Sequence, residues 1–526
     1  MPQLAGTGAV ATPRASPTPT DRFSLAGGCY ALRSASAGRL VTKASGGGYA
    51  ATADQVGDAY QLHMQATALG EYLLYGADTA FVTADSQGGV TGANSPSAAA
   101  VWRVAQVGAG AFTLTSGARA LAVAAGSGRL VLVDAAGAGA AASFAFHPAS
   151  HCAVYPEAGI DAHGTPFQGA SPIADVKGTA DPHTHLTAFE FIGGDFHCGR
   201  PWHPFGVASA LPDCASIQGP QGDAAPVQNF LDYGEPVHPH DTKGWNTFHD
   251  WPGPNRLSYE NTYYTGLKRA WLAGLRLMVT DLVDNEALCT IMTMKHNPCN
   301  DMNSVRIQSR DLFALQDYID AQSGGPGKGF FRIVSDPFHA RKVINEGKLA
   351  IVEGIELSRI FECGEHNGVP ECDQAKVERG LAEIKALGVS SFYPVHKFDN
   401  AFGGTKMDGG TVGAVVNAGN HLETNHFWDV KTCDGAASDS QQLTAPDPTV
   451  AGLLAGPFNG LLPSGTVPLY PPGAHCNQRG LTDLGTYLLK RMIQEHYIIE
   501  VDHMDVKTAN QALTEIEAKH YSGVIS

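Results

Sequence analysis

Hydrophobic and polar positions divide the chain into two regions with different periodicity. From Phe23 to about Ala149, short β-prone stretches alternate with turns rich in Gly and Ala, and almost no segment has the apolar spacing of an amphipathic helix. From about Pro156 onward, short apolar runs alternate with segments of helical periodicity. The first region is therefore expected to be all-β, and the second to contain a parallel sheet with crossover helices.

The β-rich region contains an internal repeat. An aromatic residue stands two positions before an apolar one in Tyr60-Gln61-Leu62, in Trp102-Arg103-Val104 and in Phe144-Ala145-Phe146, and 42 positions separate each aromatic residue from the next. Because one unit cannot bury its apolar face alone, three related units are expected to close on one another. Residues 23–152 are thus predicted to form a domain that resembles a β-trefoil, with the repeated aromatic residues in its core. Relatives of this fold often bind carbohydrate, but the Gln-x-Trp signature of ricin-type lectins is missing, so a carbohydrate partner rests on the resemblance alone.

The second region, residues 153–526, is predicted to be a TIM-barrel-like (β/α) domain. Helices are expected at Arg310–Ala321, Cys372–Leu387 and Asp483–Glu495. Five apolar runs end in polar or ionisable residues and are expected to be strands: Val176–His185, Leu275–Asp281, Leu349–Glu356, Val389–His396 and Tyr497–His503. In such barrels the catalytic groups lie at the C-terminal ends of the strands. Residues 1–22 are expected to be a flexible N-terminal segment, since X-Pro pairs disfavour helix there.

Metal-type ligands end four of these runs. His183 and His185 alternate on one strand and share a face, so both imidazoles can bind one ion, although a His-x-His pair alone can also be a chance or surface pair. Glu353 ends an otherwise apolar strand, where a charge is costly to bury unless a cation offsets it. His396 and His503 end two further strands. The set together predicts a metal centre.

The C-terminal half resembles a known enzyme family. Gly480-Leu481-Thr482-Asp483-Leu484-Gly485, a helix, and then Ile498–Asp505 are similar to the pattern before the sixth strand of membrane (renal-type) dipeptidases and of the wider amidohydrolase superfamily. Glu353 in its Val-Glu-Gly setting resembles the metal-bridging glutamate of that family, and His396 and His503 match its two later histidines. The resemblance covers roughly residues 175–526.

The resemblance implies a metal-dependent hydrolase of small peptides or other amides. His183, His185 and Glu353 would hold one metal ion, and Glu353, His396 and His503 a second, with a hydroxide between them. Two zinc ions are expected, with other divalent metals as an alternative, and Glu353 and His396 are the expected catalytic residues. An alternative is an extracellular glycan- or surface-binding protein with a catalytically degenerate barrel.

Two features depart from the family pattern. The family usually carries His-x-Asp on the first strand, whereas this chain has His183-x-His185. The chain also ends at Gly523–Ser526, where a seventh strand is expected, so a closing segment is expected to be missing or supplied by a separate polypeptide. Lys519 is a candidate for binding the substrate carboxylate, and Asp399 and Asn400 are candidates for shaping the mouth of the pocket.

Four other histidines have no assigned role. His197 and His203 could line the pocket or belong to a surface loop. His421 and His426 are five positions apart and so do not share a helical face as zinc ligands on a helix do; they are expected in a loop or at a helix start.

Net charge and cysteine content limit the classes of binding partner and the cellular compartment that are expected for the protein. The formal net charge of −16 argues against nucleic acid or an anionic membrane surface as a partner. No apolar run approaches the roughly 18 residues of a transmembrane helix, and no signal peptide is visible. The ten cysteines are either unrelated buried thiols or five disulfides, and pairing by sequence neighbours would join Cys29 with Cys152, Cys198 with Cys214, Cys289 with Cys299, Cys363 with Cys372 and Cys433 with Cys476. Disulfides would place the protein in an oxidising compartment, secreted or periplasmic.

Overall fold

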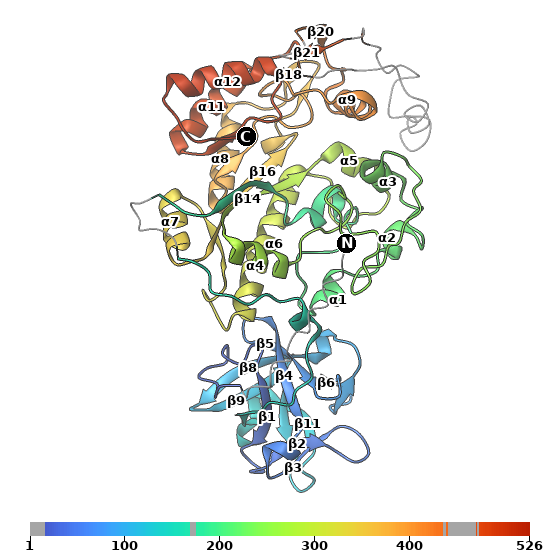
Figure 1. Cartoon of the computed structure of the whole chain (residues 1–526), viewed down its shortest axis with the longest axis vertical. Helices are drawn as coiled ribbons and strands as arrows, with labels where there is room; N and C mark the ends of the chain where they lie inside the picture. Colours follow the sequence, from blue (N-terminus) through green and yellow to red (C-terminus); the bar gives the residue numbers. More distant parts are fainter. Residues whose placement is uncertain (1–15, 169–174, 435–437, 440–469, 471–472) are drawn as a thin grey trace, which may run out of the picture. The chain divides into compact units, whose positions relative to one another are not determined.

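The structure is a computed structural model of the 526-residue chain and describes residues 16–168, 175–434, 438–439, 470 and 473–526 (Figure 1). The chain divides into two compact units. The first extends to Asp161 and also takes in Trp202–Ser209 and Leu315–Gly329, and the second takes the remainder from Ala162 onward. Each unit is considered separately below.

The first unit contains a large antiparallel sheet. Its twelve strands are β1 (Cys29–Ser34), β2 (Leu40–Lys43), β3 (Tyr49–Ala53), β4 (Gln61–Ala68), β5 (Glu71–Gly76), β6 (Phe81–Ala84), β7 (Val90–Ala93), β8 (Val101–Gly108), β9 (Ala111–Ser116), β10 (Arg119–Val123), β11 (Leu130–Asp134) and β12 (Phe144–Pro148). The first and last strands pair with each other, from Tyr30 opposite Pro148 to Ser34 opposite Phe144. This pairing brings the two ends of the β-rich region together.

The repeated aromatic residues lie in the core of this unit, as the repeat predicts. Tyr60, Trp102 and Phe144 are 9%, 0% and 1% exposed. On β8, Trp102 and Val104 are buried while Arg103 between them is exposed, which is the period-two alternation of a strand with one buried face. The buried indole N–H of Trp102 donates to the Val82 carbonyl at 2.8 Å, so its polar atom is satisfied.

Parallel strands form the framework of the second unit. One sheet has the order β13 (Thr179–Thr184), β14 (Leu275–Asp284), β16 (Leu349–Leu357) and β15 (Phe331–Val334), and another has the order β19 (Ser391–Phe392), β22 (Ile498–Glu500) and β23 (Val524–Ile525). The backbone N–H groups of Ser390 and Tyr393 donate to the carbonyls of Glu353 and Ile355, both at 3.0 Å, and so connect the second sheet to β16. The unit is therefore an α/β structure with parallel sheets, and a closed eight-stranded barrel stays a prediction.

The five expected strands coincide with β13, β14, β16, β19 and β22, although β19 and β22 are much shorter than the apolar runs that contain them. The four-residue strand β15 was not expected, because it is too short to give a periodic signal. The short pairs β17 (Glu365–His366) with β18 (Val369–Pro370) and β20 (Val430–Thr432) with β21 (His475–Asn477) are antiparallel.

Among the described residues, the α-helices all follow the β-rich region in the sequence. They are α1 (Val207–Ala210), α2 (Ala215–Gln218), α3 (Pro226–Tyr233), α4 (Tyr264–Ala273), α5 (Glu286–Ile291), α6 (Asp301–Gln322), α7 (Pro337–Asn345), α8 (Gln374–Leu387), α9 (Gly410–Thr424), α11 (Asp483–Glu495) and α12 (Val506–Ala518). Helix α11 has the same bounds as the predicted helix Asp483–Glu495. It begins after Thr482 because the Thr482 side chain caps the helix by accepting a hydrogen bond from the N–H of Gly485. Its buried residues Leu488 and Met492 belong to the same apolar core as Ile499 of β22. This packing fixes the end of β22.

All five predicted disulfides are present, namely Cys29–Cys152, Cys198–Cys214, Cys289–Cys299, Cys363–Cys372 and Cys433–Cys476. They indicate an oxidising, extracellular type of compartment. Within the described part of the chain, no helix is both long and apolar enough to cross a membrane.

Candidate metal centre

Strand β16 delivers the central carboxylate of the site. All nine of its residues are buried, and consecutive side chains point to opposite faces, so Glu353 and Glu356 lie on different faces of the strand. Gly354 shares a face with Glu356, and a Cβ atom there would come within 2.0 Å of an Asp281 carboxylate oxygen. The glycine therefore leaves room for Asp281 on the neighbouring strand β14, where the two residues are paired in register.

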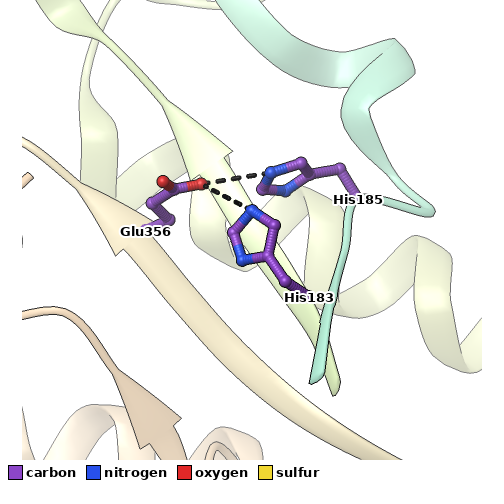
Figure 2. A group of neighbouring side chains, drawn as sticks. All are labelled: His183, His185 and Glu356. Carbon is purple, nitrogen blue, oxygen red and sulfur yellow. Dashed lines mark ion pairs between the residues drawn. The ribbon is translucent and has the colours of Figure 1, made fainter. Parts of the chain in front are cut away.

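Four histidines surround Glu356 in two pairs. One carboxylate oxygen, Oε2, lies 3.7 Å from Nε2 of His183 and 3.1 Å from Nε2 of His185 (Figure 2). The other oxygen, Oε1, lies 3.0 Å from Nε2 of His396 and 2.8 Å from Nε2 of His503. Each pair with Glu356 forms a group whose ligand atoms all lie within 4.8 Å of one another. One carboxylate thus connects two histidine pairs, each oxygen facing one pair.

The predicted role of Glu353 as the bridging ligand is corrected by this arrangement, since Glu356 lies among the histidines. Glu353 is fully buried, and neither of its carboxylate oxygens makes a hydrogen bond of ordinary geometry to any described residue. Burial raises the pKa of Glu353 to about 7, and the nearby Ser309 hydroxyl on α6 offsets part of that rise. Two glutamates end the same apolar run, and Glu356 is the one closer to the C-terminal end, where ligands of parallel strands gather.

Strand β14 orients the first histidine pair. Nδ1 of His183 lies 3.1 Å from an Asp281 carboxylate oxygen and 3.1 Å from the Tyr393 hydroxyl, while Nδ1 of His185 lies 3.0 Å from the Asp281 carbonyl oxygen. Contacts at Nδ1 leave Nε2 of both rings directed at Glu356. Such outer contacts fix the tautomer and ring orientation of metal-binding histidines.

The ionisable groups of the cluster shift one another's pKa values. Burial by itself would raise the pKa of Glu356, but the charge and hydrogen bonds of the surrounding histidines hold it well below its usual range. Burial likewise opposes protonation of His185, yet Glu356 outweighs it and raises the His185 pKa to about 9. Complete burial lowers the pKa of His396 to about 4, so this imidazole stays neutral and keeps a lone pair for a ligand bond.

Two further acids adjoin the cluster and were missed in the sequence. His183, Asp281 and Glu500 form a third group of potential ligands. Glu500 accepts a hydrogen bond from the Ser391 hydroxyl at 2.6 Å, and burial followed by the charge of Asp281 raises its pKa far above the ordinary value. Asp281 ends the expected strand Leu275–Asp281, which was the available signal, whereas Glu500 lies inside the expected strand Tyr497–His503 and ends the shorter observed strand β22.

The donor set fits a divalent metal of the zinc type. Zinc in proteins is bound by imidazole nitrogens and carboxylate oxygens, which are the donors that Glu356 and the four histidines offer. The Nδ1 atom of His396 is buried and has no hydrogen-bond partner in the described part of the chain, so it offers no competing contact that would turn the ring away.

The remaining predicted residues lie at varied positions. Asp399 and Asn400 are buried in the loop that follows β19 and His396. Asp399 also lines a pocket of about 440 Å³ together with Asn367, Gly368, His426, Asp429, Gln478 and Arg479. Lys519 is exposed directly after α12 and is not a member of the metal-ligand groups found among the described residues.

The four histidines without an assigned role lie outside the cluster around Glu356. His197 is buried with Nε2 3.5 Å from Glu260, and His203 caps its own loop through the N–H of Phe205. His421 belongs to the last turn of α9, where a loop or a helix start was expected, and His426 lies in the loop after that helix, as expected, and contacts buried Glu365. Neither pair joins the cluster around Glu356.

Comparison with known proteins finds partial likeness only. No family model and no curated protein matches the chain. A designed three-fold symmetric protein, ThreeFoil, is 19% identical with a TM-score of 0.21, over 22% of this chain and 96% of its own. A GlcNAcα1-4Gal-releasing endo-β-galactosidase from Clostridium perfringens is 12% identical with a TM-score of 0.21, over 23% and 32%. A GH43 β-1,3-galactosidase is 18% identical with a TM-score of 0.22, over 26% and 29%.

Proposed function

We propose that the second unit is a metal-dependent hydrolase of amide or peptide-like bonds, similar to membrane dipeptidases, on a (β/α)-barrel framework of the amidohydrolase type. We also infer that the first unit is β-trefoil-like. The observation that carries the functional proposal is the position of Glu356, with one carboxylate oxygen at each of two histidine pairs.

The chemistry follows from this arrangement of donors. Two zinc ions bound there would lower the pKa of a water molecule and polarise the carbonyl of the scissile bond. The residues of the chain would have distinct roles: His183 and His185 would hold one metal ion, His396 and His503 would hold the other, and Glu356 would contribute to both positions.

Residues around the ligands would orient them and manage protons. Asp281 holds the His183 ring through Nδ1, at 3.1 Å. Glu500 keeps its carboxyl proton at neutral pH, because burial and the neighbouring Asp281 disfavour its charged form. The proton on Glu500 avoids the cost of placing a second negative charge beside Asp281.

Carbohydrate binding by the first unit is not part of this proposal. The repeated aromatic residues are buried, and Trp102 uses its indole N–H within the fold. Aromatic side chains in the core offer no exposed surface for a sugar to stack on.

The activity test is hydrolysis of a panel of dipeptides by the purified chain, before and after removal of metal with a chelator and reloading with Zn2+. We expect turnover that disappears on chelation, returns on reloading, and is lost in Glu356→Gln. Turnover that persists without metal, or in Glu356→Gln, would contradict the proposal. His421→Gln, a change at a histidine outside the cluster, is the matched control and should keep full activity.

A further inference from the structure

The loop after β19 lies alongside the loop after β22. Thr405 and Met504 form an isolated antiparallel bridge. The N–H of Lys406 donates to the carbonyl of His503 at 2.8 Å, and the N–H of Asp505 donates to the carbonyl of Gly404 at 3.1 Å. The two loops that carry His396 and His503 are thus joined by backbone hydrogen bonds.

Thr405 occupies the junction between the two histidine-bearing loops. Its side chain is fully buried, and its hydroxyl donates to the carbonyl of His396 while lying 3.2 Å from the carbonyl of His503. Its backbone N–H donates to Asp399 at 2.8 Å, and its carbonyl accepts from the Asn477 amide at 3.1 Å. Every polar group of Thr405 is therefore used, and the hydroxyl alone reaches both histidine backbones.

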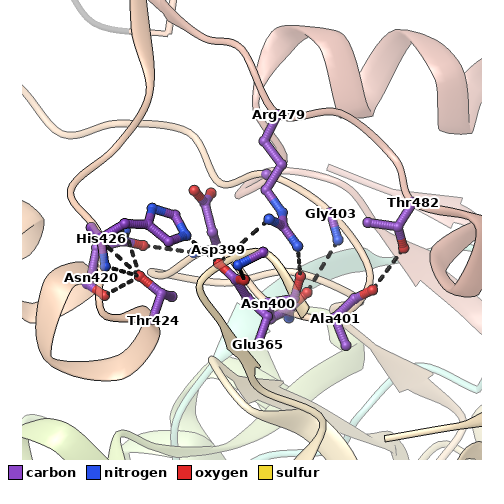
Figure 3. A network of polar contacts seen from close by, with 12 residues as sticks. Glu365, Asp399, Asn400, Ala401, Gly403, Asn420, Thr424, His426, Arg479 and Thr482 are labelled. Carbon is purple, nitrogen blue, oxygen red and sulfur yellow. Dashed lines mark hydrogen bonds and ion pairs between the residues drawn. The ribbon is translucent and has the colours of Figure 1, made fainter. Parts of the chain in front are cut away.

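The surrounding loop is fixed by its own polar network. The Asn400 side-chain oxygen accepts from the N–H groups of Phe402 and Gly403 at 2.9 and 3.2 Å, and its amide donates to the Pro394 carbonyl at 2.9 Å. Arg479 donates to the Asn400 carbonyl at 2.9 Å (Figure 3). Since the loop is held independently of Thr405, removal of one hydroxyl should leave it folded.

We propose that Thr405 is a positioning residue for the metal position formed by His396 and His503. This inference rests on the proposed function. The Nε2 atoms of the two rings lie 3.0 and 2.8 Å from the same oxygen of Glu356, and the ring centroids are 4.6 Å apart. The single hydroxyl hydrogen is donated to the His396 carbonyl, and the same oxygen lies 3.2 Å from the His503 carbonyl, so the hydroxyl adds to the backbone hydrogen bonds that hold the two histidine-bearing loops together. The His183 and His185 position has no such contact with Thr405.

The test is a zinc titration of Thr405→Val, which removes the hydroxyl and keeps the side-chain shape. Zinc would be removed from each protein and returned in competition with a fluorescent chelator. We expect one of the two zinc ions to bind about 10-fold more weakly than in the parent, at the low end of the effect of losing a group that orients a metal ligand, and the other to bind unchanged. Thr405→Ser, which retains the hydroxyl, should restore both.

Thr424→Val is the matched control. Thr424 is also fully buried, and its hydroxyl contacts two backbone carbonyls, those of Asn420 at 2.7 Å and His426 at 2.9 Å, in the network of Figure 3. The Thr424→Val variant should lose about as much stability as Thr405→Val does, and it should bind both zinc ions with unchanged affinity. If Thr405→Val does not fold, the titration is made on Thr405→Ala with the same expectation.

The outcomes separate this inference from the proposed function. Parent protein that binds no zinc overturns both. Parent protein that binds two zinc ions, together with a Thr405→Val variant of unchanged affinities, overturns the role of Thr405 alone. Equal weakening of both ions, equal weakening in Thr424→Val, or no recovery in Thr405→Ser would also overturn it.

Discussion

Glu353 and Glu356 stand three positions apart on β16 and face opposite sides of it, so that only Glu356 lies among the four histidines. Glu353 is enclosed on the other face, close to Ser309 of α6. The same strand therefore carries one carboxylate that the site stabilises as an anion and another that burial favours in the protonated form.

The buried carboxyl of Glu353 predicts a pH-dependent stability. Its folded-state pKa of about 7 lies above the ordinary value of 4.5, so the folded state holds its proton more tightly than the unfolded state. The contribution is complete below about pH 4.5 and is lost as the pH rises through 7, amounting to about 3 kcal/mol in the free energy of unfolding. Glu353→Gln should remove this pH-dependent loss. The free energy of unfolding of the variant, measured in urea, should therefore rise relative to that of the parent between pH 5 and pH 8. A difference that does not change with pH would contradict the prediction.

Trp102 is predicted to be a major source of stability in the first unit. It is fully buried and hydrogen-bonded to Val82, so Trp102→Ala would leave a large cavity and an unpaired carbonyl. We expect a loss of about 3–5 kcal/mol in the free energy of unfolding, measured by denaturant unfolding. Val107→Ala, at a residue 58% exposed on the same strand, should cost less than about 0.5 kcal/mol. Similar losses in the two variants would argue against the assigned core.

The Cys29–Cys152 disulfide closes a loop with a sequence separation of 123 residues. Replacement of both cysteines by serine should lower the stability of the first unit by about 2–5 kcal/mol, because an open chain gains conformational freedom mainly in the unfolded state. The pairing of β1 with β12 should keep the unit folded at moderate temperature. Thermal unfolding followed by circular dichroism checks this, and an unchanged midpoint would contradict it.

The sequence predicted the features that depend on local pattern. The histidines could be found because strand ends gather at one edge of a parallel sheet, which brings His183, His185, His396 and His503 together. The disulfides could be found because neighbours in sequence are paired in space, including the two cysteines that flank the repeat region. The buried aromatic residues followed from a regular interval of 42 residues.

Features set by the register between strands were not predictable in this way. Both Glu353 and Glu356 end the same apolar run, and the face each occupies depends on how β16 pairs with β14. Asp281 and Glu500 each look like an ordinary strand-end acid, and only the packing of distant strands brings them to His183. Thr405 lacks any signal, since its role depends on two loops that meet through the bridge to Met504.

The measurement that tests the central claim most directly is the zinc content of the parent chain, Glu356→Gln and Glu353→Gln, by elemental mass spectrometry after equilibration with Zn2+ and removal of free ions. If Glu356 joins two metal positions, the parent and Glu353→Gln should each hold about two zinc ions per chain, and Glu356→Gln should hold fewer than one, because the change weakens both positions at once. Two zinc ions in Glu356→Gln, or loss of zinc in Glu353→Gln instead, would contradict the account.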